Sequence, residues 1–335
     1  MQKKIINDPL NAAKETMEGF EAAYLGSVKK LKEHNAMVLN NLSERGITLL
    51  IGGGSGHEPL WGGFLGTGFA DAVVCGDIFA APGPVAILDT IREADQGLGV
   101  VIVHCNYAGD NMNFQIAAEM AAAEGIKTRI IRVWDDIATG SPEAPDERRG
   151  LVGCIYVFKV AAAAILQGKS LDEVDRLASQ ARDRVRTLGV AVKPGSIPAT
   201  GKPTFEIGDD EIEIGMGSHG EPGVKRQKIS SANELVEQML NLIIKDHNLK
   251  NGDKIALMIN NLGSTTFMEL CIINRKIMNI LKGINVDVHR SDIGTFLTTQ
   301  EMSGFSISLL KLNNELETLL DLPASSLSMK FNAKN

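Results

Sequence analysis

The sequence predicts an α/β protein of two domains, with an N-terminal lobe on a parallel sheet followed by a smaller α+β lobe. The chain has 335 residues, more than the roughly 250–300 at which a single hydrophobic core stops growing. In its first half, short apolar runs alternate with helical patterns, which is typical of a parallel sheet with covering helices. A proline- and glycine-rich segment then follows residue 190. We therefore expect an N-terminal domain at 1–190 and a C-terminal domain at 191–335.

The elements of the first half follow from their apolar periodicity and from the glycines that end them. The predicted strands are Thr48–Ile51, Ala72–Cys75, Val100–Cys105 and Arg129–Val133, and the predicted helices are Val85–Ala94, Asn113–Glu124 and Gly153–Gln167. Ser170 and Glu173 have the spacing of a capping box, which predicts a charged helix from there to about Thr187.

The second half begins with an irregular segment, because residues 193–203 contain three prolines and two glycines. Thr204–Ile207 and Glu211–Ile214 are predicted to form a hairpin across Gly208-Asp209-Asp210. The remaining predicted elements are helices Ala232–Ile244 and Thr266–Leu281 and strands Ile255–Asn260, Val286–Arg290, Phe296–Thr299 and Ser306–Lys311.

The composition of the chain restricts the kinds of partner that the protein is expected to bind. A net charge of −7 argues against a nucleic-acid or anionic membrane surface. The four cysteines form no C-x-x-C pair, and three of them, Cys75, Cys105 and Cys154, lie in apolar runs, as expected for a reducing cytoplasm. The N-terminal stretch from Met1 turns polar too early for a signal peptide, and no run reaches the roughly 18 apolar residues of a membrane span.

Two glycine-rich turns that each carry a histidine are the most informative motifs. Residues 52–59 read GGGSGHEP and residues 215–223 read GMGSHGEPG, and each follows an apolar run. Glycine allows positive φ and close approach to a ligand, and histidine exchanges protons or adds to a carbonyl near neutrality. Ordinary strand-to-helix turns with capping histidines would be the structural alternative. Two near-matching turns favour an active site that contains His57 and His219.

Familiar motifs do not account for these turns. No lysine follows either one, as a nucleotide-binding P-loop requires, and neither has the G-x-S-x-G spacing of a serine hydrolase. His57 and His219 could be imagined as metal ligands with Glu58, Asp77 or Asp110, but no ligand spacing supports a preformed site, so we predict no metal.

Other polar residues at element ends allow two interpretations. Asp110, after the strand Val100–Cys105, is either a base toward a substrate hydroxyl or a helix N-cap. For residues 260–265 (NNLGST) a capping or lobe-interface role is favoured. Trp61 and Trp134 are interpreted as packing or pocket-wall residues. Asp135 and Asp136 are expected either to cap a turn or to bind a cation. Arg148 and Arg149 are expected to bind either a phosphate or those two acids.

Together these motifs resemble the dihydroxyacetone kinase DhaK subunit family over nearly the whole chain. The resemblance rests on the two histidine turns and on Asn106-Tyr107-Ala108-Gly109-Asp110, Arg148-Arg149-Gly150, Asn260-Asn261-Leu262-Gly263 and residues 302–310 (MSGFSISLL). It implies that His219 holds a short ketose as a covalent hemiaminal and that Asp110 is the base toward its terminal hydroxyl. It further implies that His57 assists carbinol formation and that Gly53, Gly54 and Ser55 line the substrate cradle.

The resemblance also implies partners. No cofactor is expected on this chain, since the family's nucleotide is held by a separate helical domain or DhaL-like subunit. The phosphoryl donor is then ATP, or a DhaM-like phosphotransferase-system protein that rephosphorylates partner-bound ADP. We expect a cytoplasmic homodimer that binds neither nucleic acid nor membrane.

One departure from the family bears on substrate. The family usually has a substrate-contacting lysine where this chain has Cys105, a compact thiol. Erythrulose is therefore an expected alternative to dihydroxyacetone. Two other functions stay open: a catalytically silent ketose sensor that activates a transcription regulator, and a sugar-binding structural protein.

Overall fold

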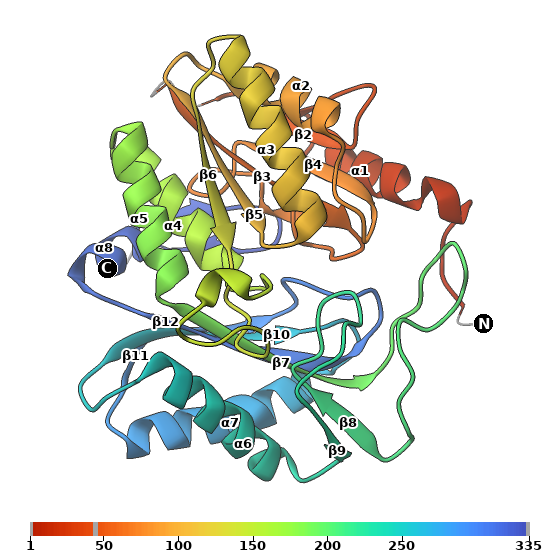
Figure 1. Cartoon of the computed structure of the whole chain (residues 1–335), viewed down its shortest axis with the longest axis vertical. Helices are drawn as coiled ribbons and strands as arrows, with labels where there is room; N and C mark the ends of the chain where they lie inside the picture. The colour runs from red at the N-terminus through yellow and green to blue at the C-terminus, as the bar shows by residue number, and fades with distance from the viewer. Residues whose placement is uncertain (1–2, 43–45, 333–335) are drawn as a thin grey trace. The chain divides into compact units, whose positions relative to one another are not determined.

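The computed structural model describes residues 3–42 and 46–332, so the predicted ends of the two domains, at Met1-Gln2 and 333–335, lie outside the described residues. The chain divides into two compact units. The first unit comprises residues up to 133, residues 154–181 and residues from 316 on, and the second comprises residues 134–153 and 182–315. The expected α/β class, with one six-stranded sheet in each unit, is confirmed (Figure 1).

The predicted linear boundary at residue 190 does not match this division. Residue 190 lies inside strand β7 (Val185–Lys193), which pairs with two other strands of the second sheet. Residues 134–153 also belong to the second unit, whereas residues 316–332 return to the first. The chain crosses between units several times because long-range strand pairing, not chain order, decides membership.

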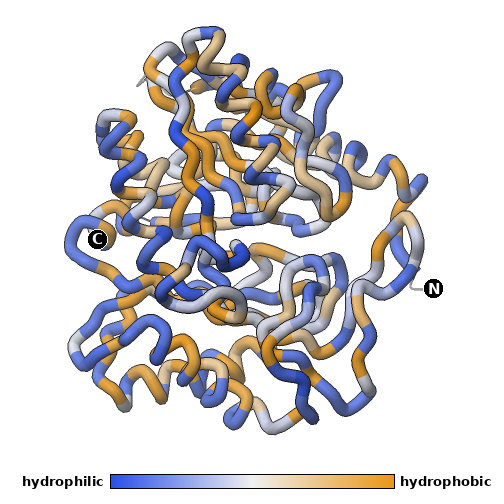
Figure 2. The backbone as a smooth tube through the Cα atoms, viewed as in Figure 1, coloured by the Kyte–Doolittle hydropathy of each residue, from blue (hydrophilic) through white to orange (hydrophobic). Residues whose placement is uncertain are grey.

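The first unit contains a six-stranded sheet in the order β1-β2-β4-β3-β5-β6. Its strands are β1 (Val28–Lys30), β2 (Ala36–Leu39), β3 (Ile47–Ser55), β4 (Ala72–Ile78), β5 (Gly99–Cys105) and β6 (Thr128–Val133). Strands β4, β3, β5 and β6 are parallel neighbours, while β1 and β2 are antiparallel. All four predicted parallel strands are therefore confirmed, and their central stretches are predominantly hydrophobic (Figure 2).

Helices cover both faces of this sheet. Its helices are α1 (Ala12–Ala23), α2 (Pro84–Ala94), α3 (Ala108–Ala123), α4 (Cys154–Leu166), α5 (Leu171–Asp183) and α8 (Asn314–Leu320), with short helices η1 (Pro9–Asn11) and η2 (Gly62–Phe64) and a small pair β13 (Ala324–Ser325) and β14 (Lys330–Phe331). Residues of α2 and α3 share one core with Leu50 and Ile102. Side chains alternate along a strand, so Leu49 and Val101 face the other side, where α4 packs on β3 and β5.

The second unit contains the sheet β11-β10-β12-β7-β8-β9, antiparallel except for the β10–β11 pair. Besides β7, its elements are η3 (Pro145–Glu147), β8 (Glu211–Ile214), β9 (Lys225–Lys228), α6 (Ala232–His247), β10 (Lys254–Asn261), α7 (Phe267–Gly283), β11 (Asp287–Gly294) and β12 (Ser303–Lys311). Helices α6 and α7 cover one face through a single apolar core with the sheet.

Three sequence predictions are wrong, one in the length of a helix and two in the element itself. The capping box of Ser170 and Glu173 is present, but α5 ends at Asp183 because β7 begins at Val185. Strand β8 pairs with β9 and not with Thr204–Ile207, so the predicted hairpin is wrong. The predicted strand Phe296–Thr299 is a loop whose residue Thr299 makes one isolated bridge.

Candidate functional site

The first histidine turn begins later than predicted. Gly52, Gly53 and Gly54 continue strand β3, which pairs with β4 and β5 up to this point, and the chain turns at Gly56 with a φ of +100°. A Cβ on Gly53 would lie 2.7 Å from the indole ring of Trp61, so glycine is required for this close approach. Trp61 is thereby a packing residue, as one interpretation of the sequence held.

Ser55 and Glu58 brace this turn. The Ser55 hydroxyl donates to the Gly76 carbonyl at 2.6 Å and therefore joins β3 to β4. A carboxylate oxygen of Glu58 accepts the Gly56 amide at 3.0 Å. Burial raises the pKa of the Glu58 carboxyl, while this amide bond acts in the opposite direction. The turn holds His57 in a buried position, with its ring centroid 5.1 Å from that of Phe79.

Asp110 lies in the first turn of α3 and is buried. The helix is capped by Tyr107 and begins at Ala108, five residues earlier than predicted, so the N-cap interpretation of Asp110 is wrong. The positive end of the helix dipole favours a carboxylate at this position. Because β3 and β5 are parallel neighbours, the segments that carry His57 and Asp110 leave the sheet at the same edge.

The end of β5 carries Cys105 and a buried histidine that sequence reasoning did not single out. Cys105 is buried, and its carbonyl oxygen lies 2.9 Å from Nδ1 of His104. The His104 ring stacks on Phe114 with centroids 4.7 Å apart. Burial lowers the pKa of His104 to about 4, so its imidazole is neutral near pH 7. His104 fills the core behind the site, and only the alternation of side chains along β5 could have indicated this.

The second histidine turn joins β8 to β9 in the second unit. Glu221 holds His219 through both carboxylate oxygens: Oε2 accepts the His219 amide at 2.8 Å, and Oε1 lies 2.9 Å from Nδ1. Burial acts to raise the pKa of Glu221, but the hydrogen bonds and charge of His219 outweigh it and bring the pKa to about 2. An ionised carboxylate only accepts, so Nδ1 carries the proton and the lone pair of the neutral ring is on Nε2.

Neighbouring loops hold this turn from two sides. Arg149 donates to the Gly215 carbonyl at 2.8 Å and to Asp136 at 2.9 Å, and Thr299 donates to the Ser218 carbonyl at 2.6 Å. The loop of Thr299 is in turn fixed by Asn260, whose side-chain oxygen accepts the amides of Phe296 and Leu297. Asn260 therefore caps backbone amides of this loop, in agreement with the capping alternative given for residues 260–265.

The charged residues between β6 and α4 have structural partners. Arg149 meets Asp136, one of the acids predicted as its alternative partner, whereas the fully buried Arg148 makes a bidentate pair with Asp246 at 2.9 and 2.6 Å. Burial raises the pKa of Asp136 to about 6, although Arg149 acts to lower it. The guanidinium of Arg182 lies over the ring of Trp134, with its Cζ atom 3.9 Å from the ring centroid.

Asp135 anchors the segment that follows β6. Its carboxylate accepts the amides of Leu151 and Gly153 at 2.6 and 2.9 Å, and its side chain is fully buried. We expect Asp135→Ala to lower the free energy of unfolding by about 3 kcal/mol, because a buried amide without an acceptor costs about 1–3 kcal/mol. Urea denaturation measures this, with the exposed Asp209→Ala as control; equal midpoints for the two variants would refute the anchoring role.

A small enclosed cavity lies behind the second histidine turn. Its lining combines backbone of the turn at Gly217 and Ser218 with apolar side chains, among them Leu262 and Met302. Met216 of the turn packs with Leu262 and Met302 in a small apolar cluster of the second unit.

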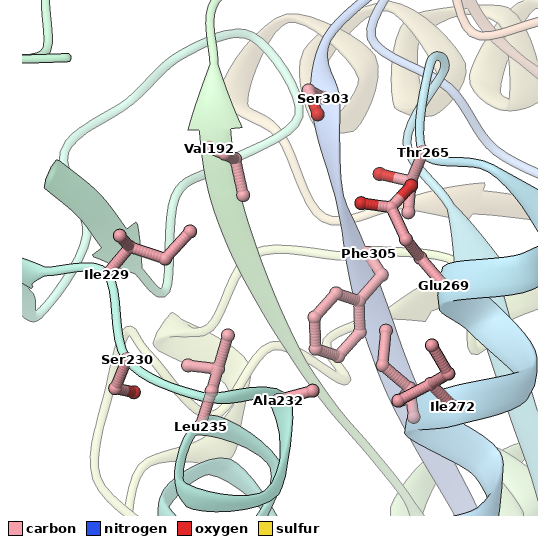
Figure 3. A pocket seen from close by; sticks show the side chains of 11 residues that line it. Val192, Ile229, Ser230, Ala232, Leu235, Thr265, Glu269, Ile272, Ser303 and Phe305 are labelled. Carbon is pink, nitrogen blue, oxygen red and sulfur yellow. The ribbon is translucent and has the colours of Figure 1, made fainter. Parts of the chain in front are cut away.

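The second unit also has an apolar cleft between its two helices and the sheet, which the sequence did not predict (Figure 3). Ile272 of α7 and Phe305 of β12 line it together with Leu235. Its acidic residue, Glu269, is engaged in the capping box of α7 with Thr266. None of the predicted site residues lines this cleft.

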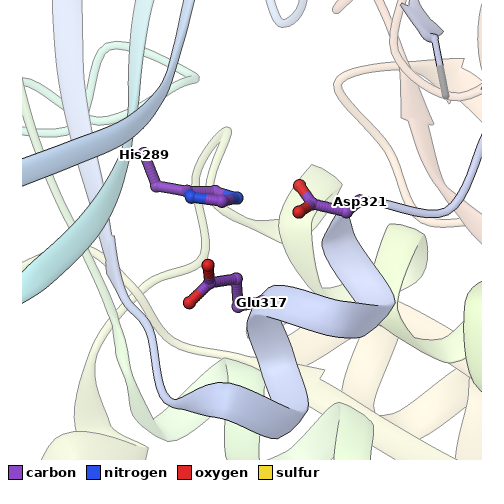
Figure 4. A group of neighbouring side chains, drawn as sticks. All are labelled: His289, Glu317 and Asp321. Carbon is purple, nitrogen blue, oxygen red and sulfur yellow. The ribbon is translucent and has the colours of Figure 1, made fainter. Parts of the chain in front are cut away.

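Acidic residues at helical spacing occur at the end of the first unit. Glu317 of α8 and Asp321, which directly follows that helix, lie one turn apart (Figure 4). The third residue drawn there, His289, belongs to β11 of the second unit. An acidic pair of this kind is common on protein surfaces and is not by itself a metal site.

In the described ranges, no helix has both the length and the apolar character that a membrane crossing requires. Three of the four cysteines, Cys75, Cys105 and Cys154, are buried as predicted, and Cys271 is exposed.

Known proteins match this chain over almost its full length. The Dak1 domain model matches residues 18–328. The dihydroxyacetone-binding subunit DhaK of PTS-dependent dihydroxyacetone kinase 1 from Listeria innocua is 38% identical over 97% of this chain and 99% of its own length. An L-erythrulose 1-kinase from Mycolicibacterium smegmatis is 34% identical over 96% of this chain, which spans 57% of that protein.

A solved structure shows the same architecture. The dihydroxyacetone kinase operon co-activator Dha-DhaQ superposes with a TM-score of 0.88 at 31% identity, covering 93% of this chain and 97% of that one. With matching sequence and fold along nearly all of its length, the chain belongs to the Dak1 domain family, as the two histidine turns predict.

Proposed function

We propose that this chain is the substrate-binding subunit of a dihydroxyacetone-type ketose kinase, in which His219 holds the ketose covalently. Membership of the Dak1 family and the DhaK name of a 38% identical relative support this function. The observation that carries the role of His219 is its Nδ1 contact with Glu221 at 2.9 Å. That contact leaves the Nε2 lone pair as the nucleophile of the ring.

The covalent step replaces the carbonyl π bond by a C–N bond and an O–H bond. As Nε2 bonds to the carbonyl carbon, the π electron pair moves to the carbonyl oxygen, which takes a proton that solvent supplies through His57. The ring becomes positively charged, and the Glu221 carboxylate compensates that charge. A polyol such as glycerol has no carbonyl and cannot be held in this way.

Phosphoryl transfer then takes place at the terminal hydroxyl of the bound ketose. We propose that Asp110 accepts the hydroxyl proton while the oxygen attacks the terminal phosphorus of the partner's nucleotide. The bond from that phosphorus to the nucleotide breaks, and ADP stays on the partner. We also propose that backbone at Gly53 and Gly54 borders the substrate. The Ser55 hydroxyl instead bonds to Gly76. The phosphoryl group comes from a helical, nucleotide-binding DhaL-like subunit, charged by ATP or through a phosphotransferase-system protein. A homodimer of this chain is part of the same proposal.

Intact-protein mass analysis tests the covalent step. Incubation with dihydroxyacetone or erythrulose is expected to add the mass of one ketose to the protein, and His219→Ala is expected to remove that addition. His34→Ala, a partly exposed histidine in the first unit that pairs with Asp89, serves as the matched control and keeps the adduct. An adduct that survives in His219→Ala would refute the assignment.

A ketose sensor is the second candidate, because the co-activator Dha-DhaQ has the same fold at 31% identity. Both functions predict the adduct, so turnover separates them. A kinase subunit phosphorylates the ketose when the helical subunit and its donor are supplied, whereas a sensor binds the ketose and transfers nothing. The compact thiol of Cys105 makes erythrulose a necessary member of the substrate panel.

A further inference from the structure

His104 is a buried histidine whose ring makes one hydrogen bond. Its side chain is fully buried, and Nδ1 lies 2.9 Å from the carbonyl oxygen of Cys105. A carbonyl oxygen only accepts, so Nδ1 carries the proton of the neutral ring and the lone pair is on Nε2. Among residues 3–42 and 46–332, no group forms a hydrogen bond with Nε2. A leucine or phenylalanine would fill the same space without leaving a polar atom unpaired, so the Nδ1 contact is what distinguishes histidine here.

The carbonyl that His104 binds belongs to the turn between β5 and α3. Only Asn106 and Tyr107 separate the end of β5 from the start of α3. The Cys105 carbonyl oxygen accepts the Tyr107 amide at 2.9 Å as well as the His104 ring. Tyr107 is the N-cap of α3, and its own carbonyl accepts the Asn111 amide at 2.8 Å. The His104 ring therefore holds the carbonyl to which the N-cap of α3 is bonded.

The face of the same ring contacts α3 itself. The imidazole stacks on Phe114 with an interplanar angle of 7° and centroids 4.7 Å apart. Phe114 follows Asp110 by four residues, so both side chains lie on one face of α3, and both are buried. A Cβ on Gly52 would lie 3.0 Å from Cζ of Phe114, so the phenyl ring also lies against β3. This packing restricts rotation of α3 about its axis, and with it the direction of the Asp110 side chain.

We propose that His104 is a positioning residue for Asp110, because it fixes the start of α3 through the Cys105 carbonyl and the rotation of α3 through Phe114. His104 acts only through Asp110 and makes no contact with the substrate. A general base must lie within about 3 Å of the hydroxyl that it deprotonates, and a displacement of about 1 Å can lower the rate about 10²-fold. This inference rests on the proposed function, since it needs Asp110 to be the base.

Three variants of His104 separate its two contacts. His104→Leu removes both and is expected to lower the phosphorylation rate about 10–100-fold at saturating ketose and helical subunit. His104→Asn places an amide donor near the position of Nδ1, and His104→Phe keeps an aromatic ring on Phe114. Each of these two is expected to recover part of the rate. The ketose concentration for half-maximal adduct on His219 is expected to be unchanged in all three, since capture of the ketose does not use Asp110.

A double variant distinguishes positioning from a loss of stability. In an Asp110→Asn background, His104→Leu is expected to leave the residual rate nearly unchanged, because no base remains to be positioned. Phe69→Leu is the matched control, since it removes an equally buried ring of the first unit at its contact with Phe331, and it is expected to keep the wild-type rate. A wild-type rate in His104→Leu, or a full further loss in the double variant, overturns the proposal.

Amide hydrogen exchange tests the positioning role without phosphoryl transfer. Exchange at residues 108–114, the first turns of α3, is expected to be about tenfold faster in His104→Leu than in wild type and unchanged in Phe69→Leu. His104→Phe, which keeps the core filled, gives the same comparison where His104→Leu does not fold. Equal exchange in the His104 variants and wild type overturns the proposal. A wild-type protein that forms no ketose adduct would instead refute the proposed function.

Discussion

Asp110→Asn is expected to lower the rate of ketose phosphorylation by about 10²–10⁴-fold while leaving the ketose adduct on His219 intact. The amide has nearly the size of the carboxyl group but cannot take the hydroxyl proton. Its effect on the fold is expected to be small, since loss of a charge from the first turn of a helix costs about 0.3–1 kcal/mol. The rate is measured at saturating helical subunit, and the adduct is measured by intact mass.

The matched control for this variant is Asp172→Asn. Asp172 also lies in the first turn of a helix, α5, but it is exposed and pairs with Arg129. Its replacement is expected to leave the rate unchanged. A rate for Asp110→Asn within threefold of wild type would place the base elsewhere, even if the adduct on His219 forms normally.

The parallel sheet that precedes Asp110 could be predicted because each of its strands has a recognisable local sequence pattern. Val100–Cys105 follows Gly99 and is apolar except for His104, the pattern of a strand buried on both faces. Residues 52–54 were harder, because glycine disfavours strands. Pairing with β4 and β5 overrides that preference, and such pairing cannot be read from a local window.

The errors in the second unit have the same origin. Strand β9 reads KRQK and has no apolar alternation, so its pairing with β8 leaves no trace in the sequence. The sequence predicts helix α5 four residues too long, because Arg184–Thr187 suits a helix locally. Pairing with β12 makes the residues from Val185 on part of a strand instead. A linear domain boundary fails for the same reason.

The sequence indicates His57 and His219 because each lies in a glycine-rich turn. It does not indicate how the fold positions their side chains. Glu221 stands two residues after His219 in the sequence, where a carboxylate can equally well point into solvent. Its role depends on the fold of the turn, in which Gly220 has a φ of +88° and the Gly217 amide donates to the Glu221 carbonyl at 2.9 Å. Such a contact between near neighbours is decided by backbone geometry.

Glu221→Ala is expected to weaken ketose capture by about 10–100-fold. Hydrogen bonds to a charged group contribute about 1.5–3 kcal/mol, and this variant removes the acceptor of both Nδ1 and the backbone amide of His219. Without the carboxylate, the proton of the neutral ring is no longer held on Nδ1, so Nε2 is the nucleophile in only part of the molecules. The ketose concentration for half-maximal adduct, measured by intact mass, reports the loss.

Two further variants separate positioning from folding. Glu221→Gln keeps one oxygen for Nδ1 and is expected to recover part of the capture, while the exposed Glu206→Ala is the control and binds as wild type.

The pKa of Glu221, about 2, adds a pH criterion. A carboxyl whose pKa is depressed on folding stabilises the folded turn above the unfolded value of about 4.3, and this contribution is lost as the pH falls toward 2. Between pH 5 and 8 the carboxylate stays ionised, so the ratio of wild-type to Glu221→Gln capture should be set by hydrogen bonding to His219 and not by titration of Glu221. Equal capture by Glu221→Ala and wild type would show that His219 needs no positioning partner.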